Sequence, residues 1–337
     1  MYESFYGLKE SPFNVTPDPQ FIYLGEKHRE ALAQLLYGVK EKKGFILITG
    51  EIGTGKTTLI HYLLGKLSGS NNTRAAFLFN PKLSVHDFFQ YILKDWGIAV
   101  QGNSKGDCLH TLNQELLRAY KNGENFILIV DEAQGLNPAL LEEIRLLSNL
   151  ETSKAKLLQI VLIGQPELNK VLRQPNFRQL RQRINLRYHL RPLSKKETGE
   201  YIKKRLTVAG AKDPIFTKKA IEEVYRISGG IPRLINILCD NTLVNGYALD
   251  QKVIDHKIVR EVAKDLELEK KLLGFGSLIM LAIFVVACVL LFFFLWGGEY
   301  VLILKGFLKE SYKGAYQHIQ YFKEIIGKFV NFISHLL

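Results

Sequence analysis

GEIGTGKT, residues 50–57, lies between an apolar run and a helical pattern and matches the spacing G-x-x-x-x-G-K-T in full. In a P-loop of this spacing the glycines let backbone N–H groups turn inward around a phosphate, and the following helix adds its positive end. The lysine reaches the β- and γ-phosphates, and the next hydroxyl binds Mg²⁺. We therefore expect a strand, loop and helix that bind ATP with Mg²⁺, with Lys56 catalytic and Thr57 a metal ligand. The residues expected to hold the nucleotide here are Gly50, Glu51, Ile52, Gly53, Thr54, Gly55, Lys56, Thr57 and Thr58.

A second apolar run, FILIV at 126–130, is followed directly by Asp131 and Glu132. A carboxylate at the end of a buried parallel strand lies at the same sheet edge as the P-loop, so Asp131 is the second expected metal ligand. Glu132 is suited to orient or deprotonate the attacking water. An acidic pair at this place is also typical of a helix cap, but beside a P-loop it favours ATP hydrolysis.

The alternation of apolar runs with helical patterns indicates an α/β fold. The expected strands are 44–49, 75–80, 126–130, 159–164 and 187–190. The expected helices around them are 28–40, 57–67, 85–96, 109–122, 138–150 and 166–181. Such strands are typical of a parallel sheet buried on both faces. The pattern then becomes purely helical, at 195–209, 217–227, 232–247 and 253–268. We expect an ATPase core at 1–192 and a small helical lid at 193–270.

Polar residues that follow later elements complete the predicted site. Gln165 ends the fourth apolar run, where its amide can position a water near the γ-phosphate. Arg181 and Arg183 end a helix just before the last strand. We expect one of these two, in preference to Arg178, to reach into a neighbouring subunit's site. Arg233, near the start of a lid helix, is expected to touch the γ-phosphate and couple hydrolysis to lid motion. A surface salt bridge is the alternative for each arginine.

The chain of 337 residues carries a net charge of +12, and basic residues concentrate between Arg178 and Arg205. Such a block can bind phosphates, anionic lipid or nucleic acid, or form solvated helix faces. The three cysteines are far apart and lack metal-ligand spacing, which argues against a disulfide framework and for a reducing compartment. The first residues show no charged-then-apolar leader, so no cleaved signal peptide is expected.

These motifs resemble those of the AAA+ ATPases, with residues 50–58 as Walker A, 128–133 as Walker B, Gln165 at sensor 1 and Arg233 at sensor 2. More narrowly, YESFYGLKESPFNVTPDPQFIYLGEKHREAL, GQPEL and SGGIPRLIN are similar to stretches of the ExeA/GspA-like ATPases, which are associated with general (type II) secretion, pilus, and exopolysaccharide or exosortase gene clusters. The resemblance covers about residues 1–268. It implies strand order 5-1-4-3-2, ring-like homo-oligomers such as a hexamer, a cytoplasmic ATPase, and an N-terminal segment near the adenine around residues 23–28.

Secretion members of this family usually carry a peptidoglycan-binding domain beyond a membrane helix, whereas residues 297–337 alone follow the apolar segment here. The resemblance therefore does not extend to cell-wall binding. The ATPase core also resembles the TniB/TnsC transposition regulators, which bind DNA.

The segment 272–298 contains no charged residue, and a membrane helix needs about 20 largely apolar residues. We expect one span at 272–296. Six Lys or Arg residues lie in 252–271 and three in 297–316, which places the ATPase domain inside. The tail, 297–337, has the pattern of an amphipathic helix, which can lie on the outer membrane surface, dock on a partner or pair with its own copies. Its apolar face is formed by Ile319, Phe322, Ile326, Phe329 and Ile333.

The expected protein is thus a single-pass ATPase of the bacterial inner membrane that drives or regulates assembly of an envelope export system. Its expected partners are its own copies and envelope assembly proteins that contact the lid, the membrane helix or the tail, while nucleic acid is not expected. Two alternatives stay open. One is a nucleotide switch or scaffold without turnover, and the other is a DNA-dependent AAA+ ATPase of the transposition-regulator type.

Overall fold

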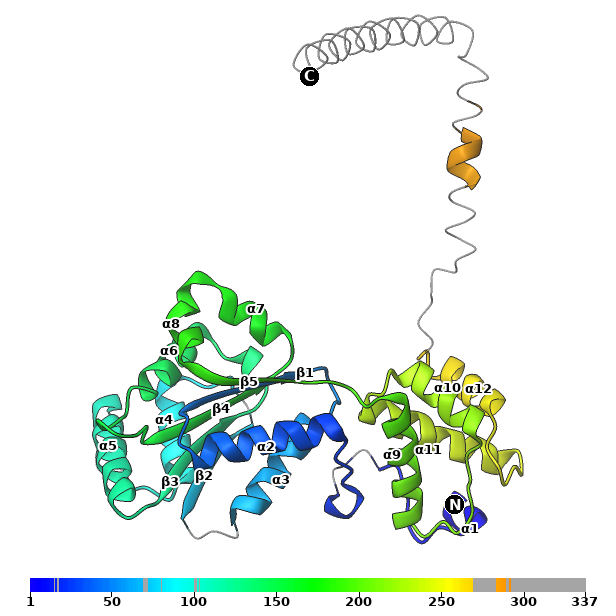
Figure 1. Cartoon of the computed structure of the whole chain (residues 1–337), viewed down its shortest axis with the longest axis horizontal. Helices are drawn as coiled ribbons and strands as arrows, with labels where there is room; N and C mark the ends of the chain where they lie inside the picture. The colour runs from blue at the N-terminus through cyan, green and yellow to red at the C-terminus, as the bar shows by residue number, and fades with distance from the viewer. Residues whose placement is uncertain are drawn as a thin grey trace, which may run out of the picture. The chain divides into compact units, whose positions relative to one another are not determined.

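A computed structural model of the chain describes residues 1–14, 16, 18–68, 72–79, 81–99, 102, 104–268, 283–288 and 291. The chain divides into two units, Met1–Glu269 and Lys270–Leu337. The first unit holds a parallel sheet with helices on both faces and a group of helices after it (Figure 1). The α/β core and the helical lid are therefore present.

Five parallel strands form the core sheet in the order β2-β3-β4-β1-β5 (Figure 1). Their bounds are Phe45–Gly50 (β1), Thr73–Leu78 (β2), Asn125–Val130 (β3), Leu158–Gly164 (β4) and Ile184–Leu190 (β5). The order is the expected 5-1-4-3-2 read from the other edge. The P-loop α/β fold and its strand order are thus confirmed.

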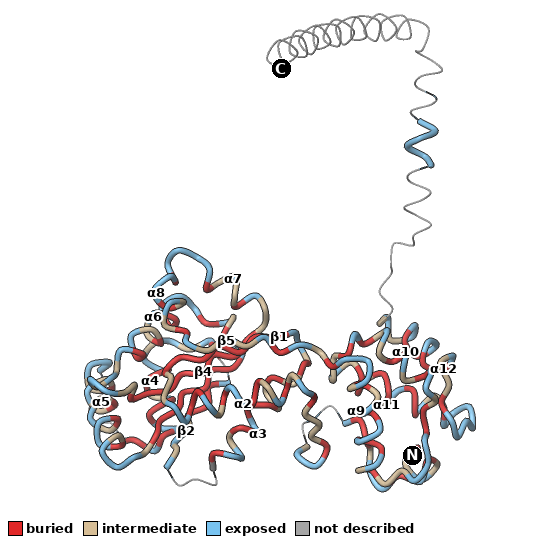
Figure 2. The backbone as a smooth tube through the Cα atoms, in the orientation of Figure 1, coloured by how far each residue is buried: buried red, intermediate tan, exposed pale blue. Residues whose placement is uncertain are grey.

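Helices cover both faces of the sheet because alternate strand residues point to opposite sides. In β1, Phe45 and Leu47 join one apolar cluster while Ile46 and Ile48 join the other. Figure 2 shows the strands as the most continuously buried part of the core. One face packs on α2 (Glu26–Lys40) and α3 (Lys56–Ser68). The other packs on α4 (Val85–Asp95), α5 (Lys105–Lys121), α6 (Pro138–Leu147), α7 (Glu167–Arg173) and α8 (Arg178–Arg183).

The prediction of a single helix at 166–181 is wrong. The structure has α7, a 3-10 turn η3 (Pro175–Phe177) and α8 in its place. Pro175 has no backbone N–H and disfavours helical geometry in the residue before it. Gln174 accordingly has φ −60° and ψ 146°, an extended conformation. The break starts a separate short helix that ends at Arg183.

The lid consists of α9 (Lys195–Val208), α10 (Lys218–Ser228), α11 (Pro232–Ala248) and α12 (His256–Asp265). The N-terminal helix α1 (Tyr2–Tyr6) and the 3-10 turn η1 (Pro19–Phe21) pack into the same apolar cluster as these helices. Tyr6 Oη also donates to the carbonyl oxygen of Gln251 at 3.0 Å. The first residues of the chain are therefore built into the lid rather than into the sheet.

The segment between β5 and α9 is hydrogen-bonded to the turn that starts α11. The N–H of Leu193 donates to the carbonyl oxygen of Gly230 at 2.9 Å. Gly230 has φ 77°, and a Cβ there would lie 1.9 Å from the Leu193 carbonyl oxygen, so glycine is required. This contact fixes the beginning of α11, and with it Arg233, against the connection from the core.

The predicted membrane helix at 272–296, and the inner-membrane location derived from it, are corrected by the structure. Of that segment only 283–288 and 291 are described. Within the described part of the chain, no helix has both the length and the apolar character that a bilayer crossing needs. The predicted amphipathic tail at 297–337 lies outside the described residues.

Candidate nucleotide site

The loop between β1 and α3 has the shape that a phosphate cradle requires. Gly53 and Gly55 adopt φ angles of 78° and 93°, in the region that favours glycine. The buried Thr54 closes the turn, since its Oγ1 donates to the carbonyl oxygen of Glu51 at 2.8 Å. Helix α3 begins directly afterwards at Lys56, so its positive end adjoins the loop. Loop and helix together can bind the phosphates of a nucleotide.

Lys56 is held against this loop by its own backbone. Its Nζ donates to the carbonyl oxygens of Gly50 at 2.8 Å and Glu51 at 3.0 Å. Burial lowers the pKa of Lys56, and the carboxylates of Glu132, Asp131 and Glu51 act in the opposite direction. The ammonium group therefore lies ready at the cradle, close to acidic groups that favour its charged form.

The half-buried hydroxyl of Thr57 and the buried carboxylate of Asp131 are hydrogen-bonded beside the cradle. Thr57 Oγ1 donates to Asp131 Oδ2 at 2.8 Å, and Asp131 is buried at the carboxyl end of β3. Mg²⁺ prefers oxygen ligands and is commonly held by one or two protein groups together with substrate phosphates. The Thr57–Asp131 pair fits that requirement.

Glu132 has an unusual backbone and a constrained side chain. Its φ of 49° and ψ of 36° are left-handed, and its N–H donates to Asp131 Oδ1 at 2.8 Å. Its carboxylate Oε2 accepts from Gln165 Nε2 at 3.1 Å and also from Gln134 Nε2. The residue is exposed on the pocket wall, where a carboxylate can accept a proton from water.

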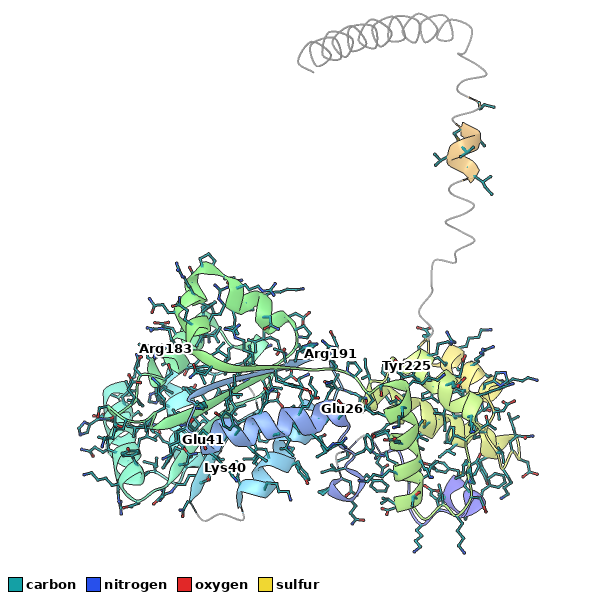
Figure 3. All side chains as sticks on the ribbon, in the orientation of Figure 1. Glu26, Lys40, Glu41, Arg183, Arg191 and Tyr225 are labelled. Carbon is teal, nitrogen blue, oxygen red and sulfur yellow. The ribbon has the colours of Figure 1, made fainter. Side chains whose placement is uncertain are left out.

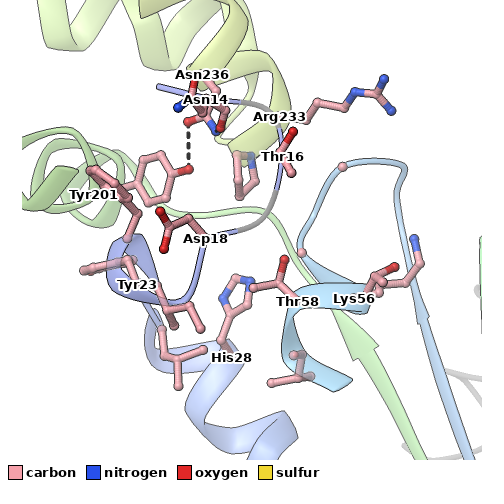
Figure 4. A pocket seen from close by; sticks show the side chains of 18 of the residues that line it. Asn14, Thr16, Asp18, Tyr23, His28, Lys56, Thr58, Tyr201, Arg233 and Asn236 are labelled. Atoms are coloured by element: carbon pink, nitrogen blue, oxygen red, sulfur yellow. Dashed lines mark hydrogen bonds between the residues drawn. The ribbon is translucent and has the colours of Figure 1, made fainter. Parts of the chain in front are cut away.

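A cavity of about 310 Å³ extends from the cradle towards the lid (Figure 4). Its lining combines the N-terminal segment, the start of α2, the P-loop with α3, the turn after β3, and the lid helices α9 and α11. The predicted residues on this wall are Ile52, Gly53, Gly55, Lys56, Thr57, Thr58, Glu132 and Arg233. The cavity therefore adjoins the P-loop N–H groups as well as the side chains of the N-terminal segment.

Arg233 lies above the P-loop turn (Figure 4). Its N–H donates to the carbonyl oxygen of Gly53 at 3.3 Å, and a Cβ on Gly53 would lie 2.7 Å from the Cβ of Arg233. The start of α11 therefore rests on the tip of the P-loop. The P-loop and the lid are therefore in direct contact at this point.

A buried arginine that the sequence reasoning missed holds the N-terminal segment over the cavity. Arg205 Nη2 donates to the carbonyl oxygen of Asn14 at 3.2 Å, and Nε donates to that of Pro12. The Arg205 guanidinium also lies 4.9 Å from the centre of the Phe21 ring. Tyr201 completes the arrangement by accepting from Arg205 Nη1 at 2.8 Å.

His28 joins the start of α2 to the P-loop. One ring nitrogen, Nε2, lies 2.8 Å from the carbonyl oxygen of Thr54. Burial lowers the pKa of His28, so the ring is neutral at pH 7, and Nε2 must carry the proton to donate to that carbonyl. His28 is one of the residues at 23–28 singled out from the sequence, and it lines the cavity together with Tyr23 and Leu24.

The remaining predicted residues do not line the cavity of their own chain. Arg183 ends α8 just before the amino end of β5, and Arg191 follows the carboxyl end of that strand near the lid (Figure 3). Since β1 and β5 are parallel, Arg181 and Arg183 lie at the sheet edge opposite the P-loop. Arg183 Nη1 donates to Ser148 Oγ at 3.2 Å. Gln165 contacts the site through Glu132, whose carboxylate accepts from its side-chain amide.

Comparison with known proteins gives two sequence matches. A family model described as an AAA domain matches residues 39–172. General secretion pathway protein A of Aeromonas hydrophila is 47% identical over 260 residues, which are 77% of this chain and 46% of that protein. The chain thus spans less than half the length of the curated relative that it matches.

Solved structures share the fold at low sequence identity. The ORC2 protein of Aeropyrum pernix, in ADPNP-ADP complexes, has a TM-score of 0.56 and 16% identity, covering 76% of this chain and 71% of its own. The Drosophila ORC bound to DNA has a TM-score of 0.58 and 18% identity, covering 76% and 64%. The RuvB Holliday junction branch migration motor of Thermotoga maritima has a TM-score of 0.51 and 20% identity, covering 75% and 73%.

Proposed function

Since the chain is an AAA+ ATPase of the group similar to general secretion pathway protein A, we propose that it hydrolyses ATP to drive or regulate assembly of a bacterial export system. The export system would be of the type II secretion, pilus or exopolysaccharide kind. The proposal of ATP hydrolysis rests on one observation. Lys56, the Thr57–Asp131 pair and the Glu132 carboxylate lie together beside one cavity.

The proposed binding mode follows from the two ends of the cavity. The β- and γ-phosphates bind to the N–H groups of the P-loop and to Lys56. The base lies against the N-terminal segment that Arg205 holds in place. Thr57 and Asp131 would hold Mg²⁺, which would neutralise charge on the phosphate oxygens.

The proposed reaction is attack of a water on the γ-phosphorus. As the new P–O bond forms, the bond from that phosphorus to the β–γ bridging oxygen breaks, and ADP leaves. Glu132 accepts the proton of the water, and Gln165 holds the carboxylate in place. Arg233 joins the start of the lid helix α11 to Gly53 of the P-loop, so we propose that release of phosphate alters this contact.

We expect the purified full-length protein to release phosphate from ATP only when Mg²⁺ is present, because two of the proposed ligands are oxygen atoms placed for that ion. Chelation with excess EDTA should stop release, and added Mg²⁺ should restore it. A coupled phosphate assay measures both steps. An equal rate with and without the chelator contradicts the proposed site.

The two arginines proposed to act on a neighbouring copy differ in their contacts within the chain. Arg183 is bound to Ser148, whereas the guanidinium of Arg181 has no hydrogen bond or ion pair within the described part of the chain. We therefore propose Arg181 as the residue that reaches a second copy. Arginines supplied in this way typically contribute about 10³-fold or more to hydrolysis.

Arg181→Ala should accordingly lower kcat by about 10³-fold while the Kd for ATP stays near the wild-type value. Arg183→Ala, the matched control, should act mainly on stability. Mixing Arg181→Ala with an equally inactive Glu132→Gln protein should restore activity, because some interfaces then combine an intact Arg181 with an intact Glu132. A mixture as inactive as its components contradicts action in trans.

A further inference from the structure

Gln134 makes two specific contacts beside the proposed catalytic carboxylate. It lies in the 3-10 turn η2 (Ala133–Gly135), which follows β3 and the Asp131–Glu132 pair. Its Nε2 donates to Glu132 Oε2, and its Oε1 accepts from the backbone N–H of Gln165 at 3.0 Å. One side chain therefore joins the carboxylate to the backbone at the end of β4.

The orientation of the Gln134 amide is set by its partners. The backbone N–H of Gln165 is a donor only, so the group that faces it must be the amide oxygen. The NH₂ group then necessarily faces Glu132, which as a carboxylate can only accept. Both contacts are satisfied by this one arrangement of the amide.

The end of β4 is shaped to receive this side chain. A Cβ on Gly164 would lie 2.7 Å from Gln134 Oε1 and 2.9 Å from Leu168 Cδ2. Any larger residue at 164 would push the amide away from the Gln165 N–H. The hydrogen bond between Gln134 and the Gln165 N–H thus depends on the buried Gly164. Because the φ of Gly164 is not in the left-handed region, glycine is needed there for its small size and not for its backbone conformation.

Glu132 depends on this support because little else restrains its side chain. The residue is exposed, and two amide donors, from Gln134 and Gln165, meet its Oε2. The other oxygen, Oε1, makes no hydrogen bond within the residues that the structure describes. An exposed glutamate without such donors would sample several rotamers, and ordering it for reaction would cost entropy.

We propose that Gln134 is a positioning residue for ATP hydrolysis. It holds Oε2 of Glu132, so that Oε1 stays available to accept the proton of the attacking water. Gln134 acts through Glu132 and does not line the cavity, so nucleotide binding should not depend on it. This inference rests on the proposed function, since it assigns a role within that same reaction.

Two substitutions test it in the full-length chain. Gln134→Met keeps the length of the side chain and removes both hydrogen bonds. Gln134→Glu keeps an acceptor for the Gln165 N–H but places a second carboxylate against Glu132, and like charges repel at this distance. We expect each to lower kcat by about 10- to 100-fold, with the KM for ATP and the Kd for ADP within about twofold of wild type.

The outcomes separate positioning from mere structural support. If Gln134 only supports the end of β4, Gln134→Glu should retain wild-type kcat, and that result would overturn the proposal. Equal loss in kcat and in ADP affinity would also overturn it. The control is Gln34→Met, a change at an exposed glutamine of α2, which should leave kcat unchanged. If Gln134→Met unfolds at assay temperature, the Gln134→Glu result decides.

The same experiment distinguishes failure of the inference from failure of the proposed function. A wild-type protein without phosphate release at saturating ATP and Mg²⁺ refutes the enzymatic proposal itself. An active wild-type protein whose rate is unaffected by either Gln134 substitution refutes the positioning role alone.

Discussion

Glu132→Gln should abolish phosphate release while leaving ATP bound. The amide has nearly the same size as the carboxylate, so the contacts at the P-loop are kept, but it cannot accept a proton from water. General-base catalysis contributes about 10²- to 10⁴-fold, and kcat should fall by that factor. The variant should therefore bind ATP with near wild-type Kd, measured with a fluorescent ATP analogue, and fail in the phosphate assay.

The matched control is Glu41→Gln, which makes the same chemical change at an exposed residue after α2 (Figure 3). Its kcat should equal that of the wild type. If the proposed role in export is right, Glu132→Gln protein at wild-type abundance should stop export in cells, whereas Glu41→Gln should not. Turnover by Glu132→Gln at the wild-type rate would remove Glu132 from the mechanism.

Lys56→Met should weaken nucleotide binding itself. The substitution keeps the buried stem of the side chain and deletes the ammonium group that faces the P-loop carbonyls. Hydrogen bonds to charged groups contribute about 1.5–3 kcal/mol, which corresponds to a Kd for ATP roughly 10- to 150-fold higher. Because the lost charge also acts on the phosphates during reaction, phosphate release should fall below that of any other variant.

Lys40→Met is the control, since Lys40 is an exposed lysine at the end of α2 (Figure 3). It should leave the Kd and kcat at wild-type values. Thermal unfolding without nucleotide checks that Lys56→Met is folded, and added ATP with Mg²⁺ should raise the Tm of the wild type but not of this variant. If ATP raised the Tm of the wild type and of Lys56→Met equally, the nucleotide would bind at another site.

The core and its cradle could be read from sequence because each depends on residues close together in the chain. Continuous apolar runs such as 126–130 predict buried strands, and the glycines of GEIGTGKT predict the loop. The strand order came from family resemblance. The break at Pro175 was also readable, since proline disfavours a helix at that point, yet the apolar spacing around it suggested one helix.

Contacts between distant residues could not be predicted in this way. Arg205 and Pro12 are 193 positions apart, and no spacing in the sequence joins a lid arginine to the N-terminal segment. Gln134 is near Glu132 in the chain, but its importance depends on the Gln165 N–H, 31 positions away. The membrane span at 272–296 was predicted from the apolar composition of that segment, and no helix in the described part of the chain is long and apolar enough for it.

The most direct test is a single-turnover reaction with full-length protein in excess over radiolabelled ATP, with Mg²⁺ present. It separates an ATPase from a nucleotide switch, because both bind ATP but only the first cleaves it. We predict that wild-type protein converts the bound ATP to ADP and phosphate, while Glu132→Gln returns it intact. Intact ATP recovered from the wild type, even at high protein concentration, would contradict the account.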